Sequence, residues 1–412
     1  MKGKEPNPPA IVIGLDCITG LQTARILAGH DIPIIGIAGN RNHFCCRTTV
    51  CTQVLTANLD TADFILLLQK LGPQLSQKAV LFPCTDICVR LISRYRRQLE
   101  PWFHIALPEP KVVETLMDKM NFLTYARHAG LPIPLTSLIH NRREAEEAAA
   151  HLSYPCVVKP SLKTELWRSQ NLAKAYVAAD AEELLTLYDK VGPYAGTLIA
   201  QEWVEGTDAD LYSCNCYFDH NSNPLATFVA RKVRQWPPHT GTSSLGVEVL
   251  DDTVLETTIE LFQGIGYRGL GYVEMKRDSR TGNYYIIEPN IGRPTGRSAI
   301  AEGGNVELLY TMYCDLLERP LPPNRQQQYR ETRWVYLRHD FQSAFYYWRR
   351  GELSLGDWWR SWQGSKVYAV FSWRDPAPFL ADLGQSAALV LGAGRKKAKV
   401  RRPALVPRRK TI

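Results

Sequence analysis

The sequence predicts an α/β and α+β protein with a Rossmann-like N-terminal domain, smaller α+β lobes and a C-terminal helical extension. Three observations predict this class. Short apolar runs alternate with helical patterns over residues 9–110, strand-like segments dominate residues 211–290, and 412 residues exceed what one core usually contains. Strands that alternate with helices form parallel sheets, whereas strands that follow one another directly form hairpins.

The alternating N-terminal elements predict a parallel sheet. The expected strands are residues 10–16, 32–38 and 79–86, and the expected helices are residues 20–31 and 61–71. Gly14 and Gly20 lie in the first strand–helix turn, but their spacing departs from the G-x-G-x-x-G pattern of dinucleotide sites. The spacing favours a tight turn and argues against an NAD-linked dehydrogenase.

A different pattern begins in the second quarter of the chain. Residues 116–136 predict an amphipathic helix followed by an extended X-Pro-X-Pro segment. Two further helices, at residues 141–152 and 180–191, begin with capping-box patterns. Strand-like segments surround these helices at residues 155–161, 171–179 and 196–206. We therefore expect a small α+β lobe over about residues 152–206.

Two predicted hairpins follow, and the second concentrates polar side chains. The hairpin strands are residues 211–219 with 225–233, and residues 269–278 with 284–290. If residues 279–283 form the second loop, Glu274 lies opposite Glu288, and Asn290 shares their face. Carboxylate and amide oxygens are ligands of hard cations such as Mg²⁺. The alternative, two acids on a solvated hairpin face, leaves Asn290 and Arg293 unexplained.

The net charge of +8 comes from the C-terminus. Residues 394–410 carry nine Lys and Arg and no acid, which leaves 40 basic and 41 acidic residues in the rest of the chain. We therefore expect no specific nucleic-acid-binding face. A disordered basic tail could contact an anionic membrane surface or RNA, or stay solvated. Residues 325–393 are aromatic and basic, and they predict a helical extension whose Trp side chains pack on the body.

Cysteine spacing and hydropathy indicate the compartment. The ten cysteines lack zinc-site spacing, and the apolar N-terminal stretch is interrupted by Asp16 and lacks a cleavage site. No apolar run reaches the roughly 18–20 residues that span a bilayer. Free thiols in a reducing compartment follow from this pattern, so we expect a cytoplasmic protein.

The order of the motifs carries a family likeness. The chain contains, in sequence, M-D-K, G-L-P-I-P, V-V-K-P, Q-E-W-V-E-G-T-D, R-K-V-R-Q-W-P-P, G-Y-V-E-M-K-R-D and I-I-E-P-N. This series resembles the ATP-grasp superfamily and, within it, carboxylate–amine ligases of the D-aspartate-ligase type, and the resemblance covers roughly residues 10–320. The W-R-D-P-x-P pattern near the C-terminus is similar to the same group. The resemblance implies a pre-ATP-grasp domain, an ATP-grasp domain of two α+β lobes, a C-terminal extension and a disordered basic tail at residues 1–114, 115–324, 325–393 and 394–412.

The resemblance also implies which residues bind ATP and magnesium. Lysines suit phosphate as compact charges, and a hinge segment reads adenine through its backbone. The implied nucleotide-binding residues are Lys119, Lys159, Lys174, Gln201, Glu202, Val204 and Asp208, with Glu205 as the alternative to Asp208 at the ribose. The implied magnesium ligands are Glu274, Glu288 and Asn290, with two ions bridged by Glu288.

Three arginines are the implied catalytic cations. A guanidinium can bind a phosphate or a carboxylate with two hydrogen bonds. Those expected to hold the transferring phosphate and the substrate carboxylate are Arg231, Arg293 and Arg297.

The sequence departs from the family pattern at two places: the loop expected to cover the ATP phosphates, and the arginine expected near the substrate. Residues 161–174 contain no glycine, whereas the corresponding loop of many relatives is glycine-rich and covers the phosphates. Lys163, Arg168 or Ser and Thr hydroxyl groups would then take the place of the backbone N–H groups that cover the phosphates in those relatives. The sequence E-P-N-I-G-R delays the arginine of the usual E-x-N-x-R pattern by one residue. The acceptor end of the site is therefore expected to differ from that of relatives.

The expected function is an ATP-dependent ligase that joins a small carboxylate, such as an amino acid, to an amine. The reaction would pass through an acylphosphate and release ADP and phosphate. The first domain would shape the acceptor pocket, and the amine would need only desolvation and positioning. Two alternatives stay open: a non-catalytic ATP-binding regulatory or scaffold protein, and a membrane- or RNA-associated factor that acts through its tail.

Overall fold

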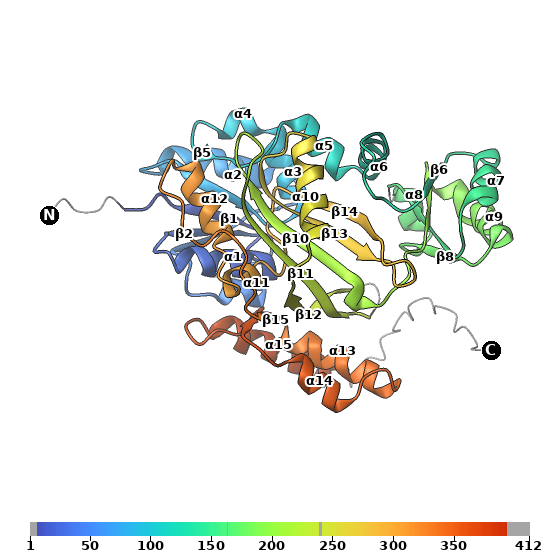
Figure 1. Ribbon diagram of the computed structural model, residues 1–412. Helices are drawn as coiled ribbons and strands as arrows, with labels where there is room; N and C mark the ends of the chain where they lie inside the picture. The colour runs from blue at the N-terminus through green and yellow to red at the C-terminus, as the bar shows by residue number, and fades with distance from the viewer. Residues whose placement is uncertain (1–5, 163, 239–240, 394–412) are drawn as a thin grey trace. The chain divides into compact units, whose positions relative to one another are not determined.

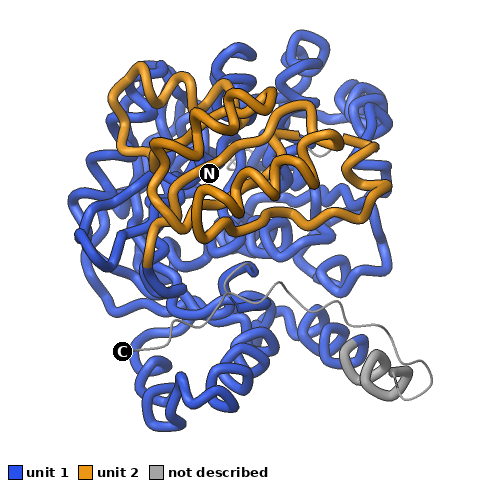
Figure 2. The backbone as a smooth tube through the Cα atoms, turned by 90° about the vertical axis from the view of Figure 1, so that its right-hand side faces the viewer, with its two compact units in different colours: residues 1–118, 206–388 blue, residues 119–205, 389–412 orange. Residues whose placement is uncertain are grey.

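In the computed structural model, which describes residues 6–162, 164–238 and 241–393, the chain divides into two units (Figure 2). Of residues 386–393 only the backbone is described. Unit 1 comprises residues 1–118 and 206–388, and unit 2 comprises residues 119–205 and 389–412. The expected basic tail at residues 394–412 lies outside the described part. The small lobe expected from about residue 152 belongs to a unit that already begins at Lys119.

The N-terminal part of unit 1 is a parallel sheet with strand order β3-β2-β1-β4-β5, which confirms the Rossmann-like prediction (Figure 1). Every residue of β1, β2 and β4 is buried, as required of strands that are covered on both faces. The strands are β1 (Ala10–Ile13), β2 (Ile34–Ala38), β3 (Gln53–Thr56), β4 (Ala79–Pro83) and β5 (Phe103–His104). The helices are α1 (Ile18–Ala28), α2 (Asp63–Leu71), α3 (Asp86–Arg94), α4 (Arg96–Leu99) and α5 (Pro110–Met117).

The turn between β1 and α1 is tight, as its glycines predicted. Gly14 has a φ of 96°. A Cβ on Gly20 would lie only 2.2 Å from the carbonyl oxygen of Gly14, so a side chain there would collide with the backbone. Both glycines therefore serve the geometry of the turn.

The central sheet of unit 1 has seven strands in the order β14-β13-β10-β11-β12-β15-β16. Both predicted hairpins are present, and they are joined because β10 pairs with β13. The strands are β10 (Leu211–Phe218), β11 (Pro224–Trp236), β12 (Thr242–Glu248), β13 (Gly269–Arg277), β14 (Tyr284–Ile291), β15 (Arg333–Val335) and β16 (Lys366–Tyr368). Helix α10 (Asp252–Gly264) packs against β10, β11 and β13 (Figure 1).

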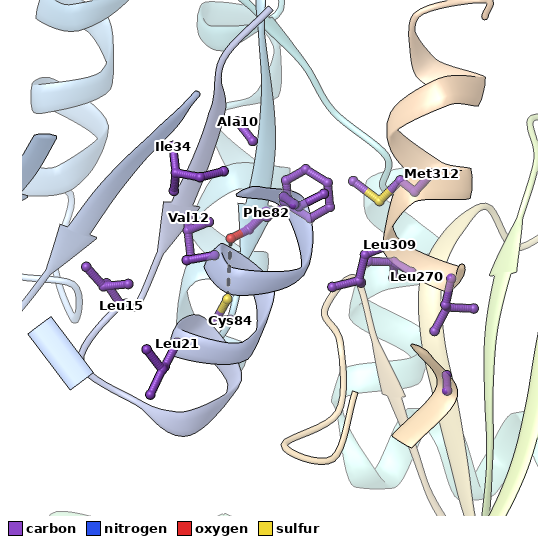
Figure 3. Packing of buried hydrophobic residues seen from close by; sticks show 14 of the residues in the cluster. Ala10, Val12, Leu15, Leu21, Ile34, Phe82, Cys84, Leu270, Leu309 and Met312 are labelled. Atoms are coloured by element: carbon purple, nitrogen blue, oxygen red, sulfur yellow. Dashed lines mark hydrogen bonds between the residues drawn. The ribbon is translucent and has the colours of Figure 1, made fainter. Parts of the chain in front are cut away.

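One hydrophobic core joins the two sheets of unit 1. Helix α12 (Leu308–Leu316) contributes Leu309 and Met312, which face Phe82 of the parallel sheet and Leu270 of β13 (Figure 3). The short helix α11 (Ala299–Gly303) contributes to the same cluster. This shared core fixes the parallel sheet relative to the central sheet.

The C-terminal extension is largely helical, as predicted, but it also contributes β15 and β16 to the central sheet of unit 1. Its helices are α13 (Leu337–Arg349), α14 (Leu355–Ser361) and α15 (Ala377–Ala393). Asp375 of the W-R-D-P pattern is buried and accepts hydrogen bonds from Arg25, Thr48 and Thr49, which anchors the extension on the parallel sheet. No helix in the described ranges is both long and apolar enough to cross a membrane.

The prediction for the Trp side chains of this extension is only partly right. Trp358 and Trp362 pack inward and donate their indole N–H groups to Asp340. In contrast, Trp348, Trp359 and Trp373 are at least half exposed, with exposed fractions of 50%, 69% and 87%.

Unit 2 is an α+β lobe with an antiparallel sheet in the order β6-β9-β7-β8, and it begins well before the lobe predicted over about residues 152–206. Its strands are β6 (Thr136–Ile139), β7 (Cys156–Pro160), β8 (Tyr176–Ala178) and β9 (Leu198–Glu202). Its helices are α6 (Lys119–His128), α7 (Arg142–His151), α8 (Glu165–Ser169) and α9 (Ala181–Val191). Asn141 and Asp180 cap α7 and α9 as predicted. The helix expected from residue 116 is instead interrupted, because Asp118 has extended backbone angles between α5 and α6.

Short 3₁₀ helices connect several of these elements. They span Phe44–Arg47, Gly72–Gln74, Gly192–Tyr194 and Asp208–Asp210.

Candidate active site

The β13–β14 hairpin places the predicted metal ligands together. Glu274 pairs directly with Glu288, and Asn290 pairs with Tyr272 on the same face. The turn differs from the predicted one, because Arg277 rather than Asp278 lies opposite Tyr284. A bulge after Glu274 shifts the register by one residue and restores the expected carboxylate pair. The two acids and the amide therefore share one sheet face.

Glu274 is held in its charged form by cations. Lys232 Nζ lies 3.1 Å from Glu274 Oε1. Burial on its own would raise the pKa of Glu274, but Lys232, Arg297 and Arg293 outweigh burial and hold this pKa below its ordinary value. Glu274 is therefore a carboxylate at neutral pH. Glu288, its partner across the hairpin, is exposed.

Arg293 connects the carboxylate edge to the parallel sheet. Its guanidinium donates to Asn290 Oδ1 at 2.7 Å, to Tyr272 Oη at 2.9 Å and to the Asp86 carboxylate. Burial would lower the pKa of Arg293, but Tyr272 and Asp86 outweigh burial and raise it. Asn290 is buried, and its Nδ2 donates to no residue of the described chain. Arg293 thus orients Asn290 while leaving the amide nitrogen available.

Arg297 is a buried cation with remaining hydrogen-bonding capacity. It is 4% exposed and donates to Ser213 Oγ at 2.8 Å and to Ser243 Oγ. Its Nε has no partner among the described residues. Burial lowers the pKa of Arg297, opposed by Glu274 and Tyr272. A buried guanidinium that binds only hydroxyl groups directly can bind an anion as well.

The structure brings Lys232, and not Arg231, to this face. Ser213 pairs with both Glu274 and Ala230, so Ala230 and Lys232 lie on the face of Glu274. Arg231 pairs with Tyr212 on the opposite face and donates to Ala209 O at 3.4 Å. The sequence motif R-K-V-R does not reveal which of its cations faces the carboxylates.

Asp208 is bound by the protein itself. It is 7% exposed, and its two oxygens accept from Gln235 Nε2 at 2.7 Å and from Tyr347 Oη at 2.6 Å. Both partners come from elements that pack on the same end of the central sheet. Both carboxylate oxygens of Asp208 are thus already hydrogen-bonded within the protein, while the ribose contact expected from the motif stays a prediction. The alternative acid, Glu205, is partly exposed.

Unit 2 brings two of the predicted nucleotide-binding residues together. Lys159 Nζ lies 3.2 Å from Gln201 Oε1, and Gln201 Nε2 donates to Thr136 Oγ1 at 2.9 Å. Glu202 is held by the backbone N–H of Ser153 at 3.1 Å, and Val204 is buried. The β7–β9 pairing thus presents a lysine and an amide on one face.

The glycine-free segment of unit 2, residues 161–174, contains the short helix α8. Trp167 of α8 is 1% exposed, and the Thr164 hydroxyl caps the helix by accepting from the Trp167 N–H at 3.0 Å. Lys174, which follows α8, and Lys119, which begins α6, are both exposed. Lys163 lies outside the described residues. A buried Trp therefore anchors this segment on its own lobe.

A cavity of about 680 Å³ opens at the carboxyl ends of the parallel strands. Asp16, Gly39, Thr56 and Thr85, which line it, follow or end β1 to β4 in turn. Asp86 follows Thr85 and accepts from Arg293, so the cavity neighbours the carboxylate edge within unit 1. The carboxyl ends of such strands are the usual place for ligands.

The donor set at the hairpin fits a hard cation. Two carboxylates and an amide oxygen are the ligand types that Mg²⁺ prefers, and such a site is completed by water and phosphate oxygens. Within the described ranges, no three His, Cys, Asp or Glu side chains are grouped as a complete metal site. A cation here would therefore depend on Asn290 and on oxygens from a bound substrate.

Comparison with characterised proteins finds ligases among the relatives. The D-aspartate ligase of Enterococcus faecium (strain Aus0004) is 24% identical over 236 residues, which cover 54% of this chain and 55% of that ligase. The chain therefore spans about half the length of this relative. No family model matches the chain.

Solved structures share the fold over most of the chain. The N5-carboxyaminoimidazole synthetase of Staphylococcus aureus, complexed with ADP, superimposes with a TM-score of 0.60 at 14% identity, covering 78% of this chain and 79% of that chain. The biotin carboxylase of Campylobacter jejuni, in a β-γ-ATP complex, has a TM-score of 0.60 at 14% identity and covers 78% and 73%. At these identities the likeness concerns the fold.

Proposed function

We propose that this chain, which resembles the ATP-grasp carboxylate–amine ligases in motif order and in fold, is an ATP-dependent ligase that joins a small carboxylate to an amine. Its relatives and structural neighbours confirm that resemblance. The observation that carries the proposal is the Glu274–Glu288 pair with Asn290, next to Lys232, the buried Arg297 and the partly buried Arg293. A carboxylate edge surrounded by cations suits the transfer of a phosphoryl group.

We assign magnesium to the hairpin. Glu274, Glu288 and Asn290 would hold one or two ions. When bound, Mg²⁺ withdraws negative charge from the transferring phosphoryl group. The low pKa of Glu274 supports this assignment, because only the ionised form is a good ligand.

The reaction would proceed in two displacements. A substrate carboxylate oxygen attacks the γ-phosphorus of ATP, the bond to ADP breaks, and an acylphosphate forms. The amine nitrogen then attacks the acyl carbon, phosphate leaves with the bonding electrons, and the nitrogen loses a proton to solvent. Arg297 and Lys232 would hold the negative charge of phosphate and carboxylate, and Arg293 would keep Asn290 oriented.

Residues of unit 2 are proposed to bind the nucleotide. Lys159 and Gln201 would contact phosphate and adenine, and Lys119 and Lys174 would supply further charge. The backbone of the hinge at residues 202–204 would read the adenine edge. Glu205 is a better candidate for the ribose than Asp208, whose oxygens already accept two hydrogen bonds.

The cavity at the parallel sheet is proposed to accept a substrate beside the carboxylate edge. Its place next to Asp86 supports this, since Asp86 and Asn290 bind the same guanidinium. The name of the D-aspartate ligase suggests an amino acid as the carboxylate. The delayed arginine, however, gives this chain its own acceptor geometry, so we leave the amine open.

Trapping of the acylphosphate tests the proposal. Purified protein would be incubated with Mg-ATP, hydroxylamine and pools of amino and other carboxylic acids. We expect hydroxamate and ADP from one pool, and we expect Glu288→Gln to abolish both while Glu260→Gln, the same change on the exposed face of α10, does not. Binding of Mg-ATP without hydroxamate from any pool would favour a non-catalytic ATP-binding protein.

A further inference from the structure

Exposed apolar side chains gather on the C-terminal extension. On α13, Phe341, Phe345 and Trp348 are 50–57% exposed, and on α14, Leu355 and Trp359 are 64% and 69% exposed. We call these five residues the aromatic stripe. The spacings of four and three residues place the members of each helix on one helical face. Single exposed apolar residues are normal on a protein surface, whereas several that lie together often mark an interaction site.

The stripe is a single, firmly held surface. The Phe341 ring lies 5.2 Å from Trp358 and 5.9 Å from Trp362, so α13 and α14 are side by side (Figure 1). The opposite face of α13 is fixed to the sheet: Asp340 binds Arg234, and Ser343 donates to Gln235 O at 3.0 Å. The exposed rings therefore lie on the outer face of a well-anchored helix.

The charge around the stripe is positive. Between residues 341 and 374 the charged side chains are five Lys and Arg and two acids, all exposed. Arg349 lies over the Phe345 ring at 5.8 Å, and the side chain of Arg360 is 70% exposed. The two acids, Glu352 and Asp357, are paired with Arg350 and Arg360. No unpaired negative charge is therefore contributed by this segment.

The sequence continues this character beyond the described helices. Residues 394–410 carry nine Lys and Arg and no acid. Aromatic rings with flanking arginines suit protein partners as well as lipid, but a polybasic segment later in the same chain favours an anionic bilayer. Stable binding to a membrane surface commonly needs two such signals.

We propose that the aromatic stripe docks this protein on the surface of an anionic lipid bilayer, without crossing it. Phe341, Phe345, Trp348, Leu355 and Trp359 enter the headgroup region, and the surrounding arginines contact lipid phosphates. This role is separate from the proposed ligase reaction, because no stripe residue belongs to the candidate site.

Vesicle co-sedimentation of the full chain tests the proposal. We expect binding to phosphatidylcholine vesicles that contain phosphatidylserine, weaker binding at high salt, and little binding to phosphatidylcholine alone. The double variant Phe345→Ser/Trp359→Ser should weaken binding about tenfold or more, because two apolar side chains no longer enter the lipid. The matched control Leu250→Ser/Tyr329→Ser removes two large side chains elsewhere that are 63% and 53% exposed, and it should bind like the wild type.

Further variants separate the stripe from the tail and from self-association. A chain truncated after residue 393 should bind more weakly but still lose binding when the stripe is changed. If the stripe variant, shown by circular dichroism to be folded, binds vesicles like the wild type, the proposal is wrong and the tail alone binds. It is equally wrong if sedimentation shows a dimer that the stripe variant abolishes and no vesicle binding, because a second copy then covers the stripe.

Discussion

Two buried arginines, Arg234 of β11 and Arg297 of the segment after β14, have the same exposed fraction, 4%, and different surroundings. Arg234 makes two hydrogen bonds to Asp340, at 2.8 and 3.0 Å, and Asp340 also accepts from Trp358 and Trp362. Arg297 binds two serine hydroxyls and keeps an unpartnered Nε within the described structure. A buried charge that is fully paired is costly to leave without its partner, whereas one with unused hydrogen-bonding capacity beside carboxylates is suited to a ligand.

The largest effect should come from breaking the paired arginine. Asp340→Ala leaves Arg234 buried without its carboxylate and should destabilise the protein by about 3–5 kcal/mol. Urea unfolding followed by circular dichroism measures this. The double variant Arg234→Met/Asp340→Leu should recover much of the loss, because it buries no charge. A loss that the double variant does not reduce would show that Asp340 acts mainly through its tryptophan partners.

The same kind of change at the unpaired arginine should affect catalysis and leave stability nearly intact. Arg297→Met should lower hydroxamate formation by about 10²–10³-fold, as expected for the loss of one group that stabilises transition-state charge. Its unfolding midpoint should stay near that of the wild type or rise. Arg297→Lys should recover only part of the activity, since lysine lacks the forked geometry. If Arg297→Met unfolds as easily as Asp340→Ala, the contrast between the two arginines is wrong.

A smaller effect is expected at the hydrogen bond between Tyr347 of the C-terminal extension and Asp208, the acid predicted to bind the ribose. Tyr347→Phe removes one hydrogen bond to the Asp208 carboxylate and should cost about 1.5–3 kcal/mol of stability. If Asp208 is structural, the KM for ATP should change little in the protein that remains folded. A large rise in KM with unchanged stability would instead return Asp208 to the nucleotide site.

The smallest expected effect is on the pH dependence of the activity. The folded-state pKa of Glu274 is depressed, so its ionised form is retained as pH falls below the usual range of a glutamate and is lost only through the lower, folded pKa. Lys232→Met removes a neighbouring cation and should move the acidic limb of the activity profile upward by about one unit or more. An Arg231→Met control, on the opposite sheet face, should leave this limb in place. Equal shifts in both variants would contradict the face assignment.

The candidate site was predictable where it depends on local pattern. Glu274, Glu288 and Asn290 belong to one hairpin, and the period of two along a strand brings them together even though the turn and bulge differ from expectation. Lys159 and Gln201 were predicted from the order of the motifs. The pairing of β7 with β9 places Lys159 Nζ 3.2 Å from Gln201 Oε1. Asn141 and Asp180 cap their helices because capping depends on adjacent residues.

Other residues could not be predicted, because they meet across long stretches of chain. The choice of Lys232 over Arg231 depends on the register of β10 with β11 and with β13. Asp86 and Arg293 are 207 residues apart, and Asp340 and Arg234 are 106 residues apart. Pairs of this kind are hydrogen bonds between elements that only the folded core brings into contact.

The sequence by itself determined the parallel and antiparallel character of the sheets, the helix caps and the carboxylate pair of one hairpin, because alternation, capping and hairpin pairing are local. The tertiary structure alone decided which cations face those carboxylates, which buried arginine is paired with a carboxylate and which aromatic rings stay exposed. Those outcomes depend on strand register and on packing between distant segments, and burial makes each pairing or exposure energetically significant.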